Sequence, residues 1–517
     1  MKRKIFTSIL LIVLIALLTV ERPSWQMSDI EITQFAGDQS AFTNQLDQRM
    51  PQWLQRYEVP GAAVALVRNG EVVWSKGYGL ADKARGVPVT PDTVFQVASI
   101  SKSVTAWGVM RLVENGQLNL DAPVEQYLTR WHLPPSSYDA KGVTIRRLLS
   151  HSAGLSVHGF DGFLPEQPLP SLEESLSGNN SSDHMDGGAG DVRIAMEPGA
   201  QFSYSGGGYT LLQLLVEEVT GETFTAFMQR KVLDALGMTH SSYEWRADLR
   251  PATAIGYNTS GQPMPNYLFT EQAAGGLYST ARDLARFVAA EMTGSNGELA
   301  GRGILAPESL TLVFTPVIKS EDAFLSESSG LGHFIETLPD GSMAVGHGGD
   351  HRGWKVQFWV IPKRREGIVI LTNSDSGPRL YTTVLRAWGH WLGTGAPSTS
   401  PISPYKQLHT AVLIIEGLAG LLGLGLVFRL VYLVRQVRAG RRQWVWRLSY
   451  KLRFWDYFGL TLSVLLTVII ALDYWILVQP SLDAFAPSQA NWLTLAVLSW
   501  CLCGAAAALL QSVKAQE

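Results

Sequence analysis

Hydrophobic positions follow two different patterns along this chain, one at its ends and one in its middle. Long, mostly apolar stretches occur at residues 5–18 and at about 409–434, 457–478 and 492–510. Each of the last three has roughly the 20 residues that a helix needs to span a bilayer. Between residues 40 and 393 the apolar runs are shorter and are separated by polar turns, which is typical of a globular unit. The pattern therefore predicts one globular domain between membrane-associated ends.

The elements expected inside the globular unit are strands at both of its ends with helices between them. Residues 61–67 and 71–75 are mostly apolar and flank Asn69-Gly70, a pair typical of a type I′ hairpin turn. A helical middle is expected from about Thr144 to Val313. Later expected elements are strands at 343–345, 355–361 and 367–372 and a helix at 380–391. This order predicts an α+β fold, with one mostly antiparallel sheet and a helical region beside it.

Two polar segments separate these parts. Residues 162–191 are polar and rich in Pro and Gly, and we expect them to form a flexible surface loop. Residues 394–408 are rich in Pro and Ser and form the expected linker. The membrane domain, with three transmembrane helices, is then expected at residues 409–517.

The distribution of charge gives these ends one consistent orientation. Basic residues precede the first apolar stretch, so residues 1–22 are expected to be a signal peptide or an N-terminal anchor. Residues 435–453 contain seven basic residues and no acidic one, whereas residues 479–491 contain Asp483 and no basic one. The positive-inside rule puts the basic loop in the cytoplasm and the globular domain outside it. We therefore expect a multi-pass protein of a bacterial cell membrane, in contact with lipid; buried helices of a soluble domain fit this charge asymmetry poorly.

A Ser-x-x-Lys pattern is the most informative chemical feature of the globular unit. Ser99 ends an apolar approach, and Lys102 follows three positions later. If Ser99 opens a helix, the amine lies beside the hydroxyl, because residues at i and i+3 are neighbours on a helix. This is the Ser-Lys form of nucleophile activation. A mostly apolar run suited to a buried helix follows as far as Asn115-Gly116, whereas the second copy, at residues 403–406, lies in the linker and is interpreted as chance.

Two further segments can supply groups to the same cleft. Tyr204 lies in a glycine-rich turn before a helical pattern, so its phenolic oxygen could act as a general base; the alternative is a turn with a half-buried aromatic ring. His347 lies in an apolar strand between glycines, which would let substrate lie along the strand edge. The alternative there is a bulged strand with a surface histidine.

Composition excludes several other classes of protein. The net charge of -3 argues against a nucleic-acid partner, and 46% hydrophobic residues in 517 allow a large core. Both cysteines, Cys501 and Cys503, fall in the last apolar stretch, so no disulfide framework and no cysteine-based metal site is expected. Neither Gly-x-Ser-x-Gly nor His-Glu-x-x-His occurs. We expect no cofactor and no metal.

Taken together and in this order, the three segments resemble the motifs of the serine β-lactamase and penicillin-binding protein superfamily, in particular its class C and DD-peptidase-like branch. That family orders its motifs Ser-x-x-Lys, Tyr-x-Asn and Lys/His-x-Gly. Supporting stretches are Leu-Leu-Ser-His-Ser-Ala-Gly-Leu at 148–155, Pro198-Gly199 and Ala-Gly-Gly-Leu-Tyr-Ser-Thr-Ala-Arg-Asp-Leu at 274–284. The resemblance covers about 350 residues and implies the family's β-lactamase/DD-peptidase fold.

The resemblance also implies a role for each matching residue. Ser99 would be the acylated nucleophile, and Lys102 its proton acceptor or electrostatic partner. Tyr204 would serve as general base and as acid for the leaving group. His347 would stand where the third motif's cation sits. Gly349 would allow close approach, and the backbone N–H groups of Ser99 and Asp350 would form the oxyanion hole.

One position departs from the family pattern, because Gly206 stands where the family has Asn. That amide ordinarily binds the acylamino group of penicillins and of muropeptide stems, so its loss weakens discrimination for such substrates. Two function classes stay open. The first is a membrane-anchored serine hydrolase acting on D-amino peptides (including cell-wall peptides), amides or esters. The second is a penicilloyl-type sensor that is acylated without efficient turnover, which the short cytoplasmic loops make less favourable.

Overall fold

The computed structural model describes residues 35–181, 190–320 and 327–397, with short pieces at 435–436, 438–440, 442–444 and 510–512. The chain divides into two compact units, Met1–Ser403 and Pro404–Glu517. The apolar stretches expected at residues 5–18, 409–434, 457–478 and 492–510 lie outside the described residues. Among the residues that are described, no helix is both long and apolar enough to cross a bilayer.

A nine-stranded sheet forms the centre of the described part of the first unit, and all of its pairings are antiparallel. Its order is β3-β2-β1-β11-β10-β9-β8-β7-β6. The strands are β1 Gly61–Arg68, β2 Glu71–Asp82, β3 Val87–Pro88, β6 Ile318–Lys319, β7 Ser328–Ser329, β8 Phe334–Thr337, β9 Met343–His351, β10 Trp354–Ile361 and β11 Glu366–Thr372. Strands from the two ends of the domain meet at the β1–β11 pairing. The expected α+β arrangement is confirmed.

The hairpin between β1 and β2 forms for the reason that its sequence indicates. A type I′ turn requires positive φ at both central residues. Asn69 and Gly70 have φ angles of 53° and 73°. The register shifts between Leu66 and Val67. Strand β2 continues to Asp82, beyond the expected end at Ser75.

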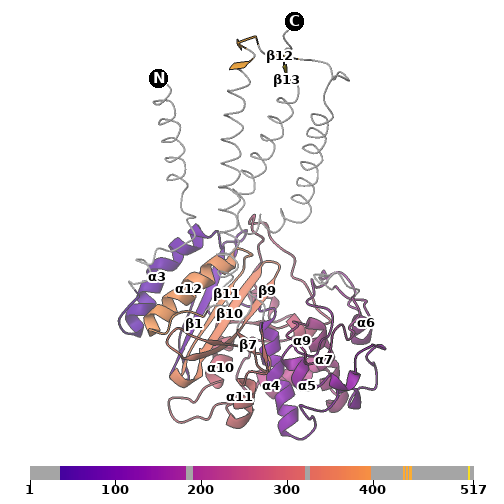
Figure 1. Ribbon diagram of the computed structural model, residues 1–517. Coiled ribbons are helices and arrows are strands. Elements are labelled where there is room, and N and C mark those ends of the chain that lie inside the picture. Colours follow the sequence, from indigo (N-terminus) through magenta and orange to yellow (C-terminus); the bar gives the residue numbers. More distant parts are fainter. Residues whose placement is uncertain are drawn as a thin grey trace. The chain divides into compact units, whose positions relative to one another are not determined.

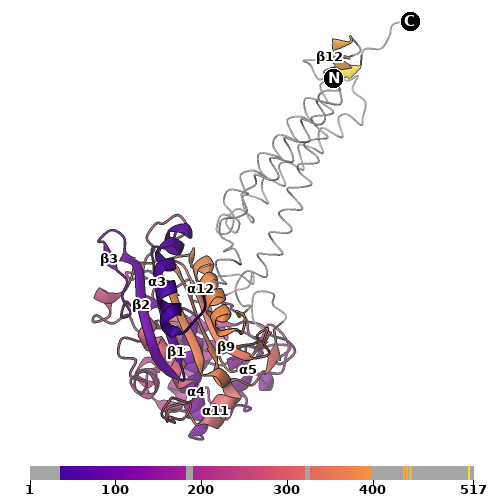
Figure 2. The same ribbon diagram turned by 90° about the vertical axis from the view of Figure 1, so that its left-hand side faces the viewer.

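Strand β1 is buried on both faces, which explains why its sequence is a continuous apolar run. Ala62, Val64 and Leu66 face a core built with helices α3, Gln39–Arg56, and α12, Gly377–Leu392. The alternate residues of β1 face a larger core, which includes helices α4, Ile100–Glu114, and α10, Ala281–Ala290. Helices α3 and α12 run side by side across one face of the sheet in both views (Figures 1 and 2).

The helical region is less regular than the sequence suggests. Its longest helix is α7, Gly206–Thr220, and long irregular segments such as residues 253–271 connect the others. The shorter elements are α5 Ile145–Leu149, α6 Leu172–Leu176, α8 Phe224–Met228 with a π-helical turn Gln229–Leu233, α9 Gln272–Gly275, α11 Pro307–Val313, and the strand pair β4 Phe95–Gln96 and β5 Tyr278–Ser279. The expectation of an unstructured surface loop at 162–191 is therefore wrong where α6 lies. A capping box between Ser171 and Glu174 starts that helix, and Leu172 and Leu176 are buried.

Candidate active site

Ser99 lies at the junction between strand β4 and helix α4. It is the N-cap of α4, and Ala98 before it has the left-handed φ of 45°, which turns the chain sharply into the helix. The helix behind it is almost entirely buried and ends with Asn115 as C-cap and Gly116 at φ 72°. The expected helix and its end are confirmed.

Two donors converge on the Ser99 hydroxyl oxygen. Lys102 Nζ donates to Ser99 Oγ at 3.1 Å, and Tyr204 Oη donates to the same oxygen at 2.9 Å. Lys102 is buried, and its amine also donates to the backbone oxygen of Ala274 at 2.6 Å. The amine lies 4.9 Å from the centre of the Tyr204 ring, within range of a cation–π attraction. The arrangement concentrates positive charge and hydrogen-bond donors on one oxygen, which stabilises that oxygen when it carries negative charge.

Tyr204 reaches Ser99 from the turn before α7. Ser205 is the N-cap of that helix: its Oγ accepts the N–H of Gly208 at 2.9 Å and donates to Ser156 O at 2.7 Å. These bonds fix the turn on both sides. The segment is therefore more than a turn with a half-buried ring, because it brings a phenol 105 positions away in sequence onto the Ser99 hydroxyl.

His347 lies close to these groups, with its ring 6.4 Å from that of Tyr204, at the position that the resemblance gives to the third motif's cation. The residue is 2% exposed, so the alternative of a surface histidine is wrong. Burial, followed by the nearby Lys102 charge, lowers the pKa of His347 from 6.5 to about 3. Its Nδ1 lies 2.6 Å from Gly348 O, and its ring lies 4.7 Å from that of Phe334. Near neutral pH the third motif therefore supplies a neutral imidazole.

The edge of β9 beside His347 is partly unpaired in the described residues. Strand β8 pairs with β9 only from Met343 to Gly346, whereas β10 pairs with β9 as far as His351. A substrate could therefore lie along the edge beyond Gly346, as the sequence suggests. Gly349 allows the close approach of Val97 rather than of a substrate, since a Cβ at Gly349 would lie 2.3 Å from the backbone oxygen of Val97. The lack of a Cβ therefore lets β9 lie close to the segment that leads to Ser99.

The carboxylate of Asp350 is directed to Lys355, with which it forms an ion pair. Lys355 also pairs with Asp375 at 3.1 Å and is half-buried between the two carboxylates. The two carboxylates raise the pKa of Lys355 against the opposing effect of burial, which is the largest single contribution. The backbone N–H groups of Ser99 and Asp350 stay the predicted oxyanion hole.

His151 is a site residue that the motif search did not single out. Its ring stacks on that of Tyr204 at 4.2 Å, and its Nδ1 accepts the backbone N–H of Ser205 at 3.1 Å. The sequence held only an indirect signal, since the residue lies in the stretch 148–155 that resembles the family. No spacing rule connects it to Tyr204.

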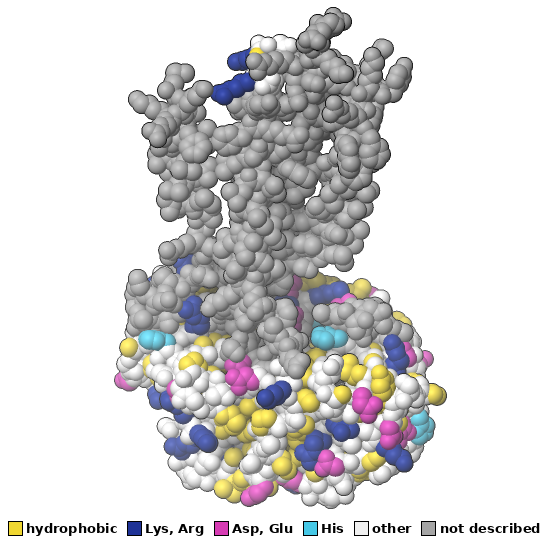
Figure 3. All heavy atoms as spheres, in the orientation of Figure 1, with side chains coloured by type: hydrophobic (Ala, Val, Ile, Leu, Met, Phe, Trp, Pro, Cys, Tyr) yellow, Lys and Arg dark blue, Asp and Glu magenta, His cyan; other side chains and the backbone are white. Residues whose placement is uncertain are grey.

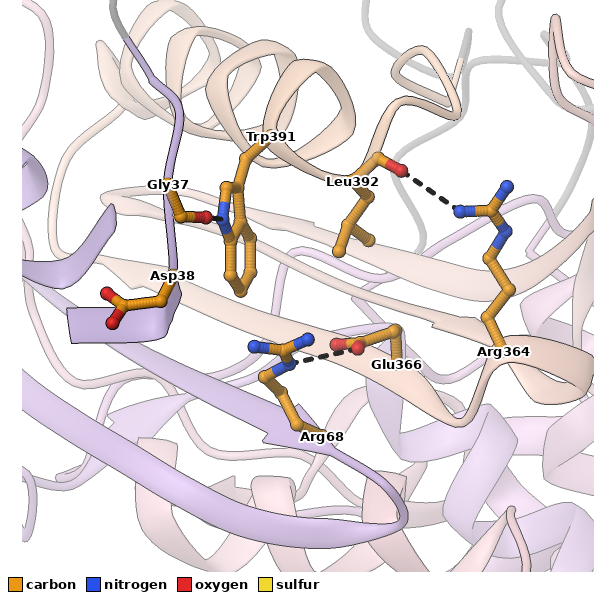
Figure 4. A pocket seen from close by; sticks show the side chains of 7 residues that line it. All are labelled: Gly37, Asp38, Arg68, Arg364, Glu366, Trp391 and Leu392. Carbon is orange, nitrogen blue, oxygen red and sulfur yellow. Dashed lines mark hydrogen bonds and ion pairs between the residues drawn. The ribbon is translucent and has the colours of Figure 1, made fainter. Parts of the chain in front are cut away.

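A hollow elsewhere on the same unit does not include any of these residues. It has a volume of about 570 Å³ and lies between the start of α3, the ends of β1 and α12, and the β10–β11 turn (Figure 4). Arg68 pairs there with Glu366 at 3.0 Å, and Trp391 Nε1 donates to Gly37 O. The face in Figure 3 mixes charges of both signs with apolar side chains. Among the described residues, no cluster of His, Cys, Asp and Glu is suited to hold a metal ion.

Comparison with known proteins agrees with this fold. A family model described as Beta-lactamase matches residues 44–387, so the chain belongs to the β-lactamase family of penicillin-binding-protein-like serine hydrolases. The chain is 24% identical over 338 residues to Protein flp of Staphylococcus aureus, which covers 64% of this chain and 63% of that protein. It thus spans less than two thirds of that relative. A human relative, Putative beta-lactamase-like 1, is 26% identical over 372 residues, which cover 69% of this chain and 71% of the human protein.

Solved structures show the same fold. The octameric penicillin-binding protein homologue from Pyrococcus abyssi matches with a TM-score of 0.58 and 27% identity, over 71% of this chain and 80% of that chain. A class C beta-lactamase matches in fold with a TM-score of 0.53 and 23% identity, over 66% and 93%.

One pH-dependent property follows from a buried histidine at the end of β9. His351 lies between the rings of Tyr267 and Phe269, and burial lowers its pKa from 6.5 to about 4. Between these values the unfolded chain binds more protons than the folded one, so this histidine costs stability as the pH falls from 6.5 towards 4. We expect the free energy of unfolding to fall, relative to a His351→Gln variant, by up to about 1.4 kcal/mol per pH unit in that window.

Urea unfolding at pH 7.5, 6 and 5 measures this difference, with the exposed His240→Gln as the comparison for a lost histidine. Equal pH slopes for wild type and His351→Gln would contradict it.

Proposed function

We propose that the chain is an extracytoplasmic serine hydrolase that works through an acyl-enzyme at Ser99, on D-amino peptides, amides or esters. The observation that carries this proposal is the convergence of Lys102 Nζ and Tyr204 Oη on Ser99 Oγ, at 3.1 and 2.9 Å. Nucleophile activation by an adjacent base needs such a constellation.

The reaction would proceed in two balanced halves. Ser99 Oγ forms a bond to the substrate carbonyl carbon, and its proton passes to Lys102 or Tyr204 acting as base. The bond to the leaving group then breaks, and that group takes a proton from Tyr204, which recovers one from Lys102 where Lys102 was the base. Water next attacks the acyl carbon and gives a proton to the base. The bond between that carbon and Ser99 Oγ breaks, the acid is released, and Ser99 Oγ takes the proton from the base. The negative oxygen formed in each half would be bound by the backbone N–H groups of Ser99 and Asp350.

His347 and Gly349 would have supporting roles in this scheme. A neutral His347, buried beside Phe334, can exchange hydrogen bonds with substrate but cannot attract a carboxylate as a cation would. Gly349 keeps β9 close to the nucleophile by admitting the backbone of Val97.

The second motif favours substrates without an acylamino group. Gly206 offers no side-chain amide, and a Cβ there would lie 3.0 Å from both His158 O and the ring of Phe160. The ring of Phe160 therefore borders the space where the family's amide would begin. We expect slow acylation by β-lactams and relatively better turnover of simple esters or D-amino-acid derivatives.

An asparagine at position 206 would restore the side-chain amide, but it needs space that the ring of Phe160 now fills. In a Phe160→Ala background, adding Gly206→Asn should raise the rate of β-lactam acylation about fivefold, the worth of one hydrogen bond of about 1 kcal/mol. Gly206→Asn alone should gain less, because its Cβ must first displace its neighbours. Stopped-flow acylation by a fluorescent penicillin measures both. Rapid penicillin hydrolysis by the wild type would contradict the proposed preference.

Turnover separates the hydrolase from the sensor alternative. The purified chain should release many equivalents of product from an ester or D-amino peptide per Ser99. A single burst of one equivalent, followed by a stable adduct with every substrate, would favour the penicilloyl-type sensor.

We also propose that residues 409–517 anchor the chain in a bacterial cell membrane. The support is the charge pattern of the sequence, with basic residues gathered at 435–453. A reporter enzyme fused after Arg441 should behave as cytoplasmic, and one fused after Thr394 as extracytoplasmic. An extracytoplasmic reporter at Arg441 would contradict this orientation.

A further inference from the structure

We propose that His151 is a positioning residue, which fixes the hydroxyl of Tyr204 on Ser99 by stacking on the Tyr204 ring and by accepting hydrogen bonds from the residues on either side of it. The inference rests on the proposed function, because it concerns the base of that reaction. It assigns a specific task to a residue that touches neither Ser99 nor, in the proposed scheme, the substrate.

His151 contacts the residues before and after Tyr204 as well as Tyr204 itself. Its backbone oxygen accepts the N–H of Ser203 at 2.7 Å, and its Nδ1 accepts the N–H of Ser205 at 3.1 Å. Between these two bonds, its ring stacks on that of Tyr204, with centroids 4.2 Å apart and an interplanar angle of 28°. The three contacts determine both the backbone position and the ring plane of Tyr204, and hence where its hydroxyl points.

The backbone of His151 is adapted to this task. Its φ is 56°, a left-handed conformation that residues other than glycine seldom adopt. Such conformations persist where the surroundings hold them, often at functional sites. Here the surroundings include Tyr209, whose ring lies 5.2 Å from that of His151 and whose hydroxyl donates to Leu149 O.

The two hydrogen bonds and the ring stack that His151 makes, called the His151 clamp below, require a neutral imidazole. An Nδ1 that accepts the Ser205 N–H carries a lone pair, so the ring proton must be on Nε2. Burial, then the charge of Lys102, lowers the pKa of His151 well below 6.5, which keeps the ring in that form. A second cation beside Lys102 is thereby avoided.

Two substitutions separate the parts of the His151 clamp. His151→Asn keeps an acceptor near the Nδ1 position and tolerates the left-handed backbone, but it removes the stacked ring. His151→Phe keeps a ring and removes the acceptor. We expect the acylation rate constant at Ser99 to fall on the order of 100-fold in His151→Asn, since small misplacements of a catalytic group cost about that much, with little change in KM. His151→Phe should lose about tenfold.

The decisive readout is a double-mutant cycle with Tyr204→Phe, measured on the purified full-length chain with a p-nitrophenyl ester. If His151 acts through the Tyr204 hydroxyl, His151→Asn should cause no further loss in the Tyr204→Phe background. An equal loss in both backgrounds would overturn the proposal, as would wild-type acylation in His151→Asn. His158→Asn is the matched control, because the ring of His158 lies 5.0 Å from that of Tyr204 without stacking on it; its loss should be smaller.

If His151→Asn fails to fold, the double-mutant cycle is measured with His151→Phe instead. Its tenfold loss in the acylation rate constant should likewise vanish in the Tyr204→Phe background. Failure of the proposed function looks different, since the wild type would then show no acylation at Ser99.

Discussion

Replacing Ser99 by Ala should abolish covalent labelling of the chain by a serine-reactive phosphonate. The reason is that Ser99 is the hydroxyl on which both Lys102 and Tyr204 converge. In-gel fluorescence of the labelled full-length chain measures the effect. Labelling that persists in Ser99→Ala would remove the basis of the catalytic assignment.

Two other serines provide controls for this variant. Ser403→Ala, at the second Ser-x-x-Lys copy, should label like the wild type. Ser101→Ala should also retain labelling but lose stability. Ser101 is fully buried, donates to Ala98 O at 2.6 Å and accepts the N–H of Leu277 at 3.0 Å. Removing that acceptor should cost about 1–3 kcal/mol in the free energy of unfolding.

Replacing Lys102 by Met should lower the acylation rate about 100- to 10,000-fold, the usual contribution of a positioned acid–base group. Methionine has a similar length and suits the buried surroundings, but it can neither accept the Ser99 proton nor stabilise the oxygen. Lys83→Met is a matched control, since Lys83 also lies over a tyrosine ring, with Nζ 5.2 Å from the centre of Tyr257, away from Ser99. Acylation by Lys102→Met within tenfold of the wild type would contradict the role of the amine.

The local parts of the fold were predictable because their causes are local. The Asn69-Gly70 turn needs two positive φ angles, and the Ser99–Lys102 contact needs one turn of helix. The turn follows from the residue types Asn and Gly, and the Ser99–Lys102 contact follows from their spacing of three positions. The helix at the end of the domain was also predicted, although it begins at Gly377 rather than Leu380, since Pro378 suits the first turn of a helix.

Other features depend on contacts between distant segments and could not be predicted. The neutrality of His347 follows from its burial and from Lys102, 245 positions earlier in the chain. The stack of His151 on Tyr204 requires both segments to be in place. The irregular segment at 253–271 has no hydrophobic period from which its path could be inferred. For Tyr204 the family resemblance, rather than any spacing rule, supplied the pairing with Ser99.

The central claim, an acyl-enzyme at Ser99, is tested most directly by trapping the acyl group itself. The full-length chain is mixed with an excess of a slowly hydrolysed ester, quenched in acid, digested with trypsin and sequenced by tandem mass spectrometry. The peptide of residues 86–102 should carry the mass of the acyl group, with the fragment ions locating it on Ser99 and not on Ser101. Turnover of the ester with the acyl group on another residue, or with no adduct on this peptide at any quench time, would contradict the account.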